Sequence, residues 1–204
     1  RTKKSSMKFS VVTITYNRAH IIGKSIQSVI NQSYQNYEHI IVDDGSTDNT
    51  KQVISSFNSN KIKYHKTSKI GRLSTLWNIG FSLSNGQYIA ILDSDDTWTS
   101  NKLNKLKNFI NKNNHIDLIF HNVEILELKT NKIFLHFNKN IDTKKMSLAV
   151  LLKNEFSVYS SSVVFNKNLT EGINTIIDEF FFDGMQDFVT RISYNKNVYY
   201  LNES

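Results

Sequence analysis

Hydrophobic positions in the first half of the chain follow two alternating patterns. Short runs of apolar and β-branched residues, typical of buried strands, are separated by segments in which apolar residues recur every three or four positions, as on one face of a helix. The predicted strands are Phe9–Thr15, Tyr37–Val42, Lys61–His65 and Gln87–Leu92, and the predicted helices are His20–Asn31, residues 48–58 and residues 71–84. This alternation predicts an α/β fold with a mostly parallel central sheet flanked by helices.

The pattern after residue 100 is less regular. It predicts helices at Asn101–Asn111, Met146–Leu152 and Met185–Tyr194, strands at Ile116–His121, Ser161–Phe165 and Val198–Leu201, and a hairpin of Val123–Leu128 with Lys132–Phe137. No internal repeat or sharp change in composition divides the chain, so we expect residues 7–204 to form a single domain. Residues 1–6 are expected to be a linker or an expression remnant outside this domain.

The composition limits the classes of partner. The chain has 204 residues and a formal net charge of +7, but its lysines are scattered among asparagine and isoleucine. It lacks the zinc-ligand, basic-heptad and aromatic RNA-binding patterns, so no nucleic-acid partner is expected. A basic surface also suits anionic donors or an anionic membrane face. No apolar run approaches the roughly 18–20 residues of a membrane span, and the absence of cysteine is compatible with a reducing compartment.

Candidate chemistry stands at the ends of two predicted strands. Asp93-Ser94-Asp95-Asp96 directly follows the fourth strand, and Asp43-Asp44 follows the second. Residues i and i+2 of an extended chain point to the same face, so Asp93 and Asp95 are predicted to converge on one target. Paired carboxylates suit Mg²⁺ or Mn²⁺, which prefer oxygen ligands and often bridge to phosphates. The alternative is an acidic loop that caps the next helix.

The position of these clusters points to a nucleotide site. Open α/β sheets bind ligands in the crevice beyond the carboxyl ends of their strands. After the first strand stands Tyr16-Asn17-Arg18, where a Rossmann or P-loop protein has a glycine-rich phosphate loop. A metal ion on the diphosphate is the natural substitute for such a loop.

Three motifs in this order, VVTITYNR, VDDGSTD and ILDSDDTW, resemble those of the family 2 glycosyltransferases, which have the GT-A (Rossmann-like) nucleotide-diphospho-sugar transferase fold. The resemblance is specific over Phe9–Trp98 and weak from there to Ser204. It implies a nucleotide-sugar-binding half at about residues 7–100 and an acceptor-binding half at about residues 101–204.

The same resemblance implies a metal-dependent, inverting hexosyl- or N-acetylhexosaminyltransferase with Mn²⁺ or Mg²⁺ as cofactor. A UDP-sugar is the expected donor, and a glycan or glycolipid of bacterial surface polysaccharide synthesis is the expected acceptor. The expected location is the cytoplasm, with peripheral association at the inner face of the cell membrane.

Carried over by position, the resemblance also implies the residues of the donor site. Tyr16 would lie against the nucleobase, and Asp44 would accept its imide N–H. Asp95 would bind the metal, with Asp93 on the metal or the ribose. The full set of nucleotide-sugar-binding residues is Thr15, Tyr16, Asn17, Asp44, Arg72, Asp93, Ser94 and Asp95, of which Asp93 and Asp95 are the metal ligands. Structural roles remain as alternatives: an aromatic residue at the edge of the core for Tyr16, and turn formation for Asn17.

The family's general base is usually an Asp in an acidic pair near the start of a late helix. Here the matching place holds Gln186-Asp187, so only Asp187 of the pair remains, with Asp183 as its rival. Trp77 stands where many members carry arginine. These two departures keep a non-catalytic nucleotide-sugar-binding module open as an alternative. A sugar-nucleotide pyrophosphorylase is less favoured, because it normally begins with a glycine-rich loop.

Overall fold

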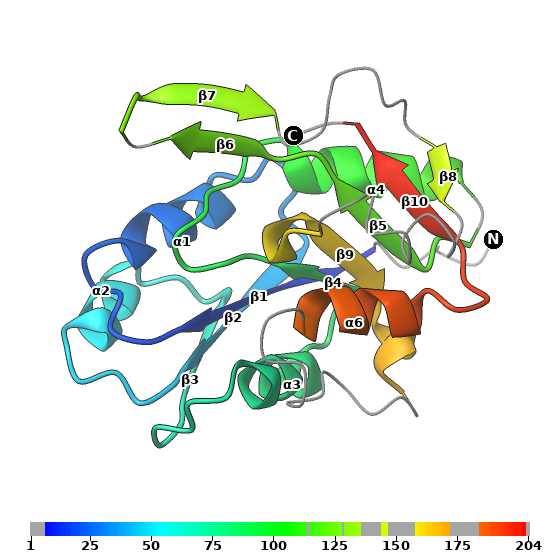
Figure 1. Cartoon of the computed structure of the whole chain (residues 1–204). Helices are drawn as coiled ribbons and strands as arrows, with labels where there is room; N and C mark the ends of the chain where they lie inside the picture. The colour runs from blue at the N-terminus through cyan, green and yellow to red at the C-terminus, as the bar shows by residue number, and fades with distance from the viewer. Residues whose placement is uncertain are drawn as a thin grey trace.

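A computed structural model describes residues 7–113, 115–127, 129–135, 144–146, 158–171 and 184–202. One sheet of eight strands has the order β3-β2-β1-β4-β9-β5-β10-β8, and β6 and β7 form a separate hairpin (Figure 1). The strands are β1 (Phe9–Thr15), β2 (Tyr37–Asp43), β3 (Ile62–Lys66), β4 (Tyr88–Ile91), β5 (Leu118–His121), β6 (Glu124–Glu127), β7 (Lys132–Leu135), β8 (Lys144–Met146), β9 (Val163–Asn166) and β10 (Val198–Leu201).

Most strands of the sheet run in the same direction. Strands β3, β2, β1 and β4 pair in parallel, and so do β5 and β10. Strand β9 is antiparallel to both β4 and β5, and β8 is antiparallel to β10. The carboxyl ends of β1, β2 and β4 therefore meet at one edge of the sheet. The predicted α/β fold with a mostly parallel sheet is confirmed.

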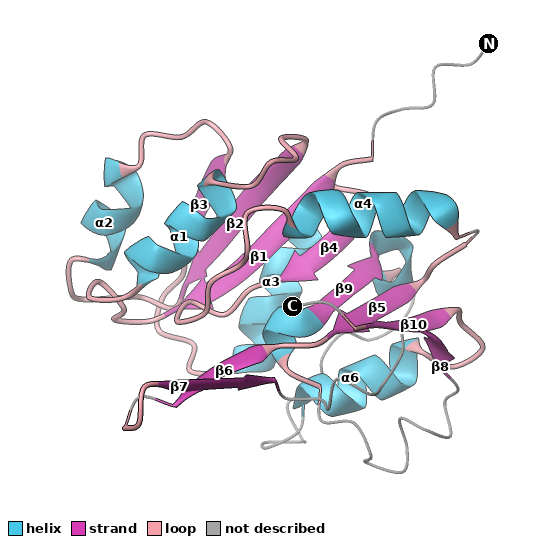
Figure 2. Cartoon of the chain, turned by 90° about the horizontal axis from the view of Figure 1, so that it is seen from above, coloured by secondary structure: helices cyan, strands magenta, loops and turns pink. Residues whose placement is uncertain are grey.

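Helices cover both faces of the sheet. Helices α1, α2 and α4 lie on one face, whereas α3 and α6 lie on the other (Figures 1 and 2). Their bounds are α1 (Ile22–Ile30), α2 (Thr50–Ser56), α3 (Leu73–Leu83), α4 (Lys102–Lys112) and α6 (Gly184–Ile192). Short 3₁₀ helices η1 (Ser160–Ser162) and η2 (Lys167–Thr170) flank β9.

The two faces explain the continuous apolar runs of the strands. In β2, Ile40 and Val42 pack in a core cluster with Phe81 of α3, whereas Ile41 packs with the helices of the opposite face. A strand covered on both sides needs apolar residues at every position instead of alternating ones. Helix α3 approaches the sheet closely at Gly80, where a Cβ atom would lie 2.4 Å from Val12.

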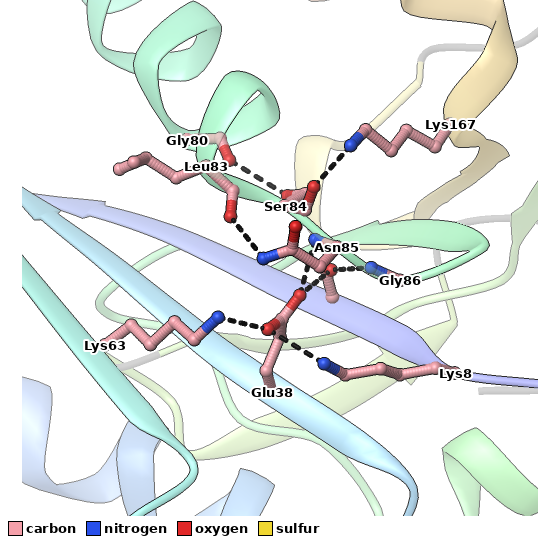
Figure 3. Close-up of polar contacts among 10 residues, drawn as sticks. Lys8, Glu38, Lys63, Gly80, Leu83, Ser84, Asn85, Gly86 and Lys167 are labelled. Carbon is pink, nitrogen blue, oxygen red and sulfur yellow. Dashed lines mark hydrogen bonds and ion pairs between the residues drawn. The ribbon is translucent and has the colours of Figure 1, made fainter.

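A buried glutamate ties the strands together at the amino edge of the sheet. Glu38 of β2 accepts hydrogen bonds from Lys8, Lys63, Ser10 and the backbone N–H of Asn85, at 3.0, 2.7, 2.6 and 2.6 Å (Figure 3). Burial alone would raise the pKa of Glu38, but these hydrogen bonds lower it to about 2. The network connects β1, β2, β3 and the turn before β4 at the edge opposite the predicted ligand crevice.

Two predictions in the second half need correction. Met146 was expected to begin a helix but ends β8, with its side chain buried in the core; residues 147–157 of that predicted helix lie outside the described residues. A short apolar run does not by itself distinguish strand from helix. The strand predicted from Ser161 begins only at Val163, because Ser160–Ser162 form η1, in which Ser162 bonds to the carbonyl of Tyr159.

Candidate functional site

Asn17 joins the loops that follow β1 and β2. Its backbone N–H donates to Ser46 Oγ at 2.8 Å, and its side-chain Oδ1 accepts from the backbone N–H of Thr47 at 2.8 Å. Its φ of 51° lies in the left-handed region, which asparagine tolerates better than most residues. Asn17 therefore fixes the shape of the loop that carries Tyr16.

The two neighbouring carboxylates after β2 have different surroundings. Asp43 is fully buried, and its carboxylate accepts from the Ser46 N–H at 2.8 Å and from the Tyr64 hydroxyl at 2.5 Å. These bonds hold the turn and connect it to β3. Asp44 instead lies beside β1, where its own N–H donates to the carbonyl of Thr15 at 2.9 Å.

Asp44 and Tyr16 share one cationic neighbour, Lys69, from the loop between β3 and α3. The Lys69 ammonium lies 2.7 Å from Asp44 Oδ2 and 3.2 Å from the centroid of the Tyr16 ring. Backbone N–H groups of Ile70 and Gly71 also donate to the Asp44 carboxylate, at 2.6 and 3.1 Å. Although burial acts to raise it, the pKa of Asp44 is lowered by the hydrogen bonds from Lys69, Ile70 and Gly71.

Arg72 follows directly in the same loop. It is exposed and precedes the first turn of α3, where its carbonyl accepts from the backbone N–H of Leu76 at 3.2 Å. The structure thus brings Tyr16, Asp44 and the Lys69–Arg72 segment together beyond β1 and β2. Trp77, by contrast, is buried in the core and stacks on Phe81, so this position does not supply a surface charge.

The acidic turn after β4 contains one partly buried carboxylate, Asp93, and two exposed ones, Asp95 and Asp96. The Asp93 N–H donates to Ser161 Oγ at 2.9 Å, and the Ser160 hydroxyl donates to the Asp93 carboxylate. Ser94 is buried, whereas the Asp95 side chain is 45% exposed and lies 3.3 Å from Arg18. The chain turns at Ser94 and Asp95, so the extended-chain argument for Asp93 and Asp95 does not apply.

The charge of Asp95 nevertheless acts on Asp93. Burial and the negative charges of Asp96 and Asp95 together raise the pKa of Asp93 to about 6, against the opposing hydrogen bond from Ser160. Such crowding of negative charge favours a cation. Within the described residues no group of three or more His, Cys, Asp or Glu side chains could enclose a metal by itself. The donor set fits Mg²⁺ or Mn²⁺ bound by one or two carboxylates together with substrate phosphates.

A buried lysine contacts Ser161, whose hydroxyl accepts a hydrogen bond from the backbone N–H of Asp93. Lys102, in the first turn of α4, donates to the carbonyl of Ser161 at 2.9 Å and lies 3.8 Å from the Trp98 ring centroid. Burial lowers its pKa, an effect that Asp96 partly opposes. Sequence reasoning missed Ser160 and Ser161, because only the insertion of β9 between β4 and β5 brings them to Asp93. It also missed Lys102, whose partner here is the carbonyl of Ser161.

Asp187 lies in the first turn of α6. Its carboxylate accepts from Arg191 Nε at 2.8 Å, and its side chain is 23% exposed. Helix α6 is anchored by the buried Phe188, which packs on Phe81 and Phe165 with ring centroids 5.6 and 5.4 Å apart. In the part of α6 that is described, no hydrogen bond joins Asp187 to the acidic turn. Asp183 lies outside the described residues.

Comparison with known proteins agrees with this architecture. The crystal structure of S. aureus TarS 1-349 in complex with UDP superposes with a TM-score of 0.83 at 20% identity, over 97% of this chain and 59% of that one. The mannosyltransferase PcManGT from Pyrobaculum calidifontis, in complex with GDP-Man and Mn²⁺, has a TM-score of 0.72 at 16% identity, over 98% of this chain and 55% of that one. The fold is therefore that of the GT-A glycosyltransferases.

Sequence comparison gives the family. The model of glycosyl transferase family 2 matches residues 10–173, and the chain belongs to this family. The UDP-Glc:alpha-D-GlcNAc-diphosphoundecaprenol beta-1,3-glucosyltransferase WfgD of Escherichia coli is 34% identical over 145 residues, which cover 71% of this chain and 55% of that protein. Glycosyltransferase GlyG of Streptococcus pneumoniae is 35% identical over 99 residues, 48% of this chain and 33% of that protein. The chain thus spans about half the length of the first of these relatives and a third of the second.

Among the described residues, no helix combines the length and the apolarity that a membrane span requires.

Proposed function

We propose that residues 7–204 form a single catalytic domain that transfers a sugar from a nucleotide diphosphate, with a UDP-sugar as donor, to a hydroxyl of a glycan or glycolipid. The observation that carries this proposal is the meeting of Tyr16, Asp44 and the acidic turn Asp93–Asp95 at one edge of the sheet. Strand ends of this kind are where α/β sheets bind nucleotides.

The choice of uridine rests on the pairing of Tyr16 with Asp44. The aromatic ring offers a flat face for a base, and the Asp44 carboxylate is an acceptor for an imide N–H, which uracil carries. Complexes of TarS with UDP and with UDP-GlcNAc support the same donor class. The name of the E. coli relative also gives UDP-Glc as donor and a diphosphoundecaprenol-linked sugar as acceptor, which supports a glycolipid acceptor.

The acidic turn would hold the metal ion. Asp95, exposed beside Arg18, and Asp93, held by Ser160, supply oxygen ligands of the kind that Mn²⁺ and Mg²⁺ take together with a diphosphate. When bound, the ion would offset the negative charge of the leaving diphosphate. Arg18, beside Asp95, and Arg72, in the loop that bonds to Asp44, would orient the phosphates. The net charge of +7 supports peripheral association with an anionic membrane at the cytoplasmic side.

The proposed reaction is a single displacement with inversion. Asp187 accepts the proton of the acceptor hydroxyl while that oxygen attacks the anomeric carbon. The bond from this carbon to the diphosphate oxygen breaks at the opposite face, and the nucleoside diphosphate leaves with the electron pair. The leaving group departs as an anion, so no carboxylic acid has to protonate it. A glycosidase, by comparison, needs two carboxylates that flank the bond.

A donor screen tests this proposal. The protein is incubated with Mn²⁺ and UDP-Glc, UDP-GlcNAc, GDP-Man or a dTDP-sugar, and products are followed by NMR. Release of UDP with an inverted sugar product supports the proposal, and tighter binding of GDP or dTDP than of UDP overturns the choice of base. Formation of a nucleoside triphosphate from pyrophosphate would indicate a pyrophosphorylase. Donor binding without any turnover, which the loss of the acidic pair at Gln186-Asp187 motivates, would indicate a binding module.

A further inference from the structure

The side chain of Lys69 contacts both groups that the proposed function assigns to the nucleobase. Its ammonium is 2.7 Å from the Asp44 carboxylate and 3.2 Å from the centroid of the Tyr16 ring. A base that stacked on this face of Tyr16 and donated its imide N–H to Asp44 would need the volume that the ammonium fills. The Lys69 ammonium and the nucleobase therefore compete for the same two side chains, Asp44 and Tyr16.

The backbone around Lys69 is anchored, so the competition is confined to its side chain. The Thr67 N–H bonds to the Asp43 carbonyl at 2.8 Å, and the Ile70 N–H bonds to Asp44 at 2.6 Å. Gly45, with a φ of 76°, packs so closely that a Cβ atom there would lie 2.8 Å from the backbone nitrogen of Lys69. The Lys69 side chain itself is 49% exposed and can turn toward water without moving this backbone.

We infer that Lys69 determines nucleotide affinity at this site: its ammonium acts as an internal ligand of Tyr16 and Asp44 that the nucleobase has to displace. The inference rests on the proposed function of these two residues as the base site. Because ion pairs and cation–π contacts of half-exposed lysines are weak, the displacement corresponds to an affinity factor of roughly three to ten. Asp44 keeps its two backbone donors after the lysine leaves, so the carboxylate stays in place.

The sign of the effect separates this inference from general electrostatics. UDP is an anion, so removing any nearby positive charge should weaken its binding. The inference predicts the opposite for Lys69→Ala, which frees the ring face and the carboxylate together. Lys69→Arg keeps a cation that also stacks on aromatic rings and should give no gain. Lys51→Ala is the matched control, because Lys51 is an exposed lysine of α2 and its loss changes the net charge equally.

Calorimetric titration with UDP and Mn²⁺ tests the inference on these variants and on the wild-type protein. Lys69→Ala should bind UDP roughly three to ten times more tightly than wild type, and Lys51→Ala should bind equally or more weakly. Pyrophosphate with Mn²⁺, which has no base, should show no gain. If wild type binds UDP and Lys69→Ala binds it equally or more weakly, the inference about Lys69 is wrong, whereas the proposed donor site stands. If neither protein binds any nucleotide, the proposed donor site is wrong and the inference fails with it.

Discussion

Replacing Glu38 by glutamine tests whether the amino-edge network fixes the sheet. Glutamine keeps the size and can still accept hydrogen bonds from Ser10 and Asn85, but it loses the two ion pairs. Glu38 is 3% exposed, and its lysine partners Lys8 and Lys63 are 36% and 49% exposed. The change therefore removes the buried negative charge that attracts Lys8 and Lys63 (Figure 3). It adds no volume to the site.

The expected magnitude follows from the pKa of Glu38. A fall from the ordinary value of 4.5 to about 2 in the folded protein corresponds to about 3 kcal/mol of stability at neutral pH. Water screens the two lysines, so we expect a loss of about 2 kcal/mol in Glu38→Gln. Because the folded-state pKa is lowered, this stabilisation is present above about pH 4.5 and is lost as the pH falls through about 2. At pH 3 roughly two fifths of it remains.

Urea unfolding at pH 7 and at pH 3, followed by circular dichroism, measures both values. The difference between wild type and Glu38→Gln should be about 2 kcal/mol at pH 7 and below about 1 kcal/mol at pH 3. Glu171→Gln is the matched control, since Glu171 is exposed and its variant should differ from wild type by less than about 0.5 kcal/mol. An equal loss at both pH values would refute the electrostatic explanation, and no loss at either would show that the network contributes nothing to stability.

Three further predictions concern the candidate site. Asp95→Ala should abolish the Mn²⁺-dependent part of UDP binding in calorimetry, and full turnover of this variant in EDTA would contradict a metal role for Asp95. Because the carboxylate is 45% exposed, the free energy of unfolding should change by less than about 0.5 kcal/mol. Tyr16→Ala should weaken UDP binding by about 1–3 kcal/mol, typical of base stacking, and unchanged affinity would remove Tyr16 from the site. Asp187→Asn should lower turnover by roughly 10²–10⁴-fold at unchanged donor affinity. Loss of transfer in Asp183→Asn but not in Asp187→Asn would make Asp183 the base.

The first half of the fold could be predicted because its signals are local. Every residue of β2, and every residue of β1 except the partly buried Ile14, is buried. Helix α1, which has a clear apolar face, separates the two strands. Motifs at the strand ends then located the candidate site through the chain topology alone. The second half gave weaker signals. Met146 shows why: its side chain is apolar and buried, but the pairing of β8 with β10, far away in sequence, decides its conformation.

The supporting residues of the site could not be predicted for a related reason. Ser160 reaches Asp93, and Lys102 bonds to the carbonyl of Ser161, only because β9 enters the sheet beside β4. Serine and lysine at these positions carry no pattern of their own. Lys69 is a different case. It stands next to Ile70 and Gly71 in a loop after a parallel strand, where a basic residue could have been noticed, but its contact with Tyr16 depends on the path of the loop over Gly45.

The surroundings of the acidic turn favour a functional over a purely structural interpretation. A turn that only had to cap α4 would keep its carboxylates in water, where they are solvated at little cost. Here Asp93 is partly buried beside Asp95 and Asp96, and burial together with their charges raises its pKa to about 6. The Ser160 hydroxyl and the buried Lys102 hold this unfavourable arrangement in place. At the opposite edge of the sheet, Glu38 is also buried, but two lysines and two further donors bond to it and lower its pKa. Asp93 has negative neighbours instead, and a bound cation would offset their repulsion. This difference supports the acidic turn as the binding site of a cation and an anionic donor.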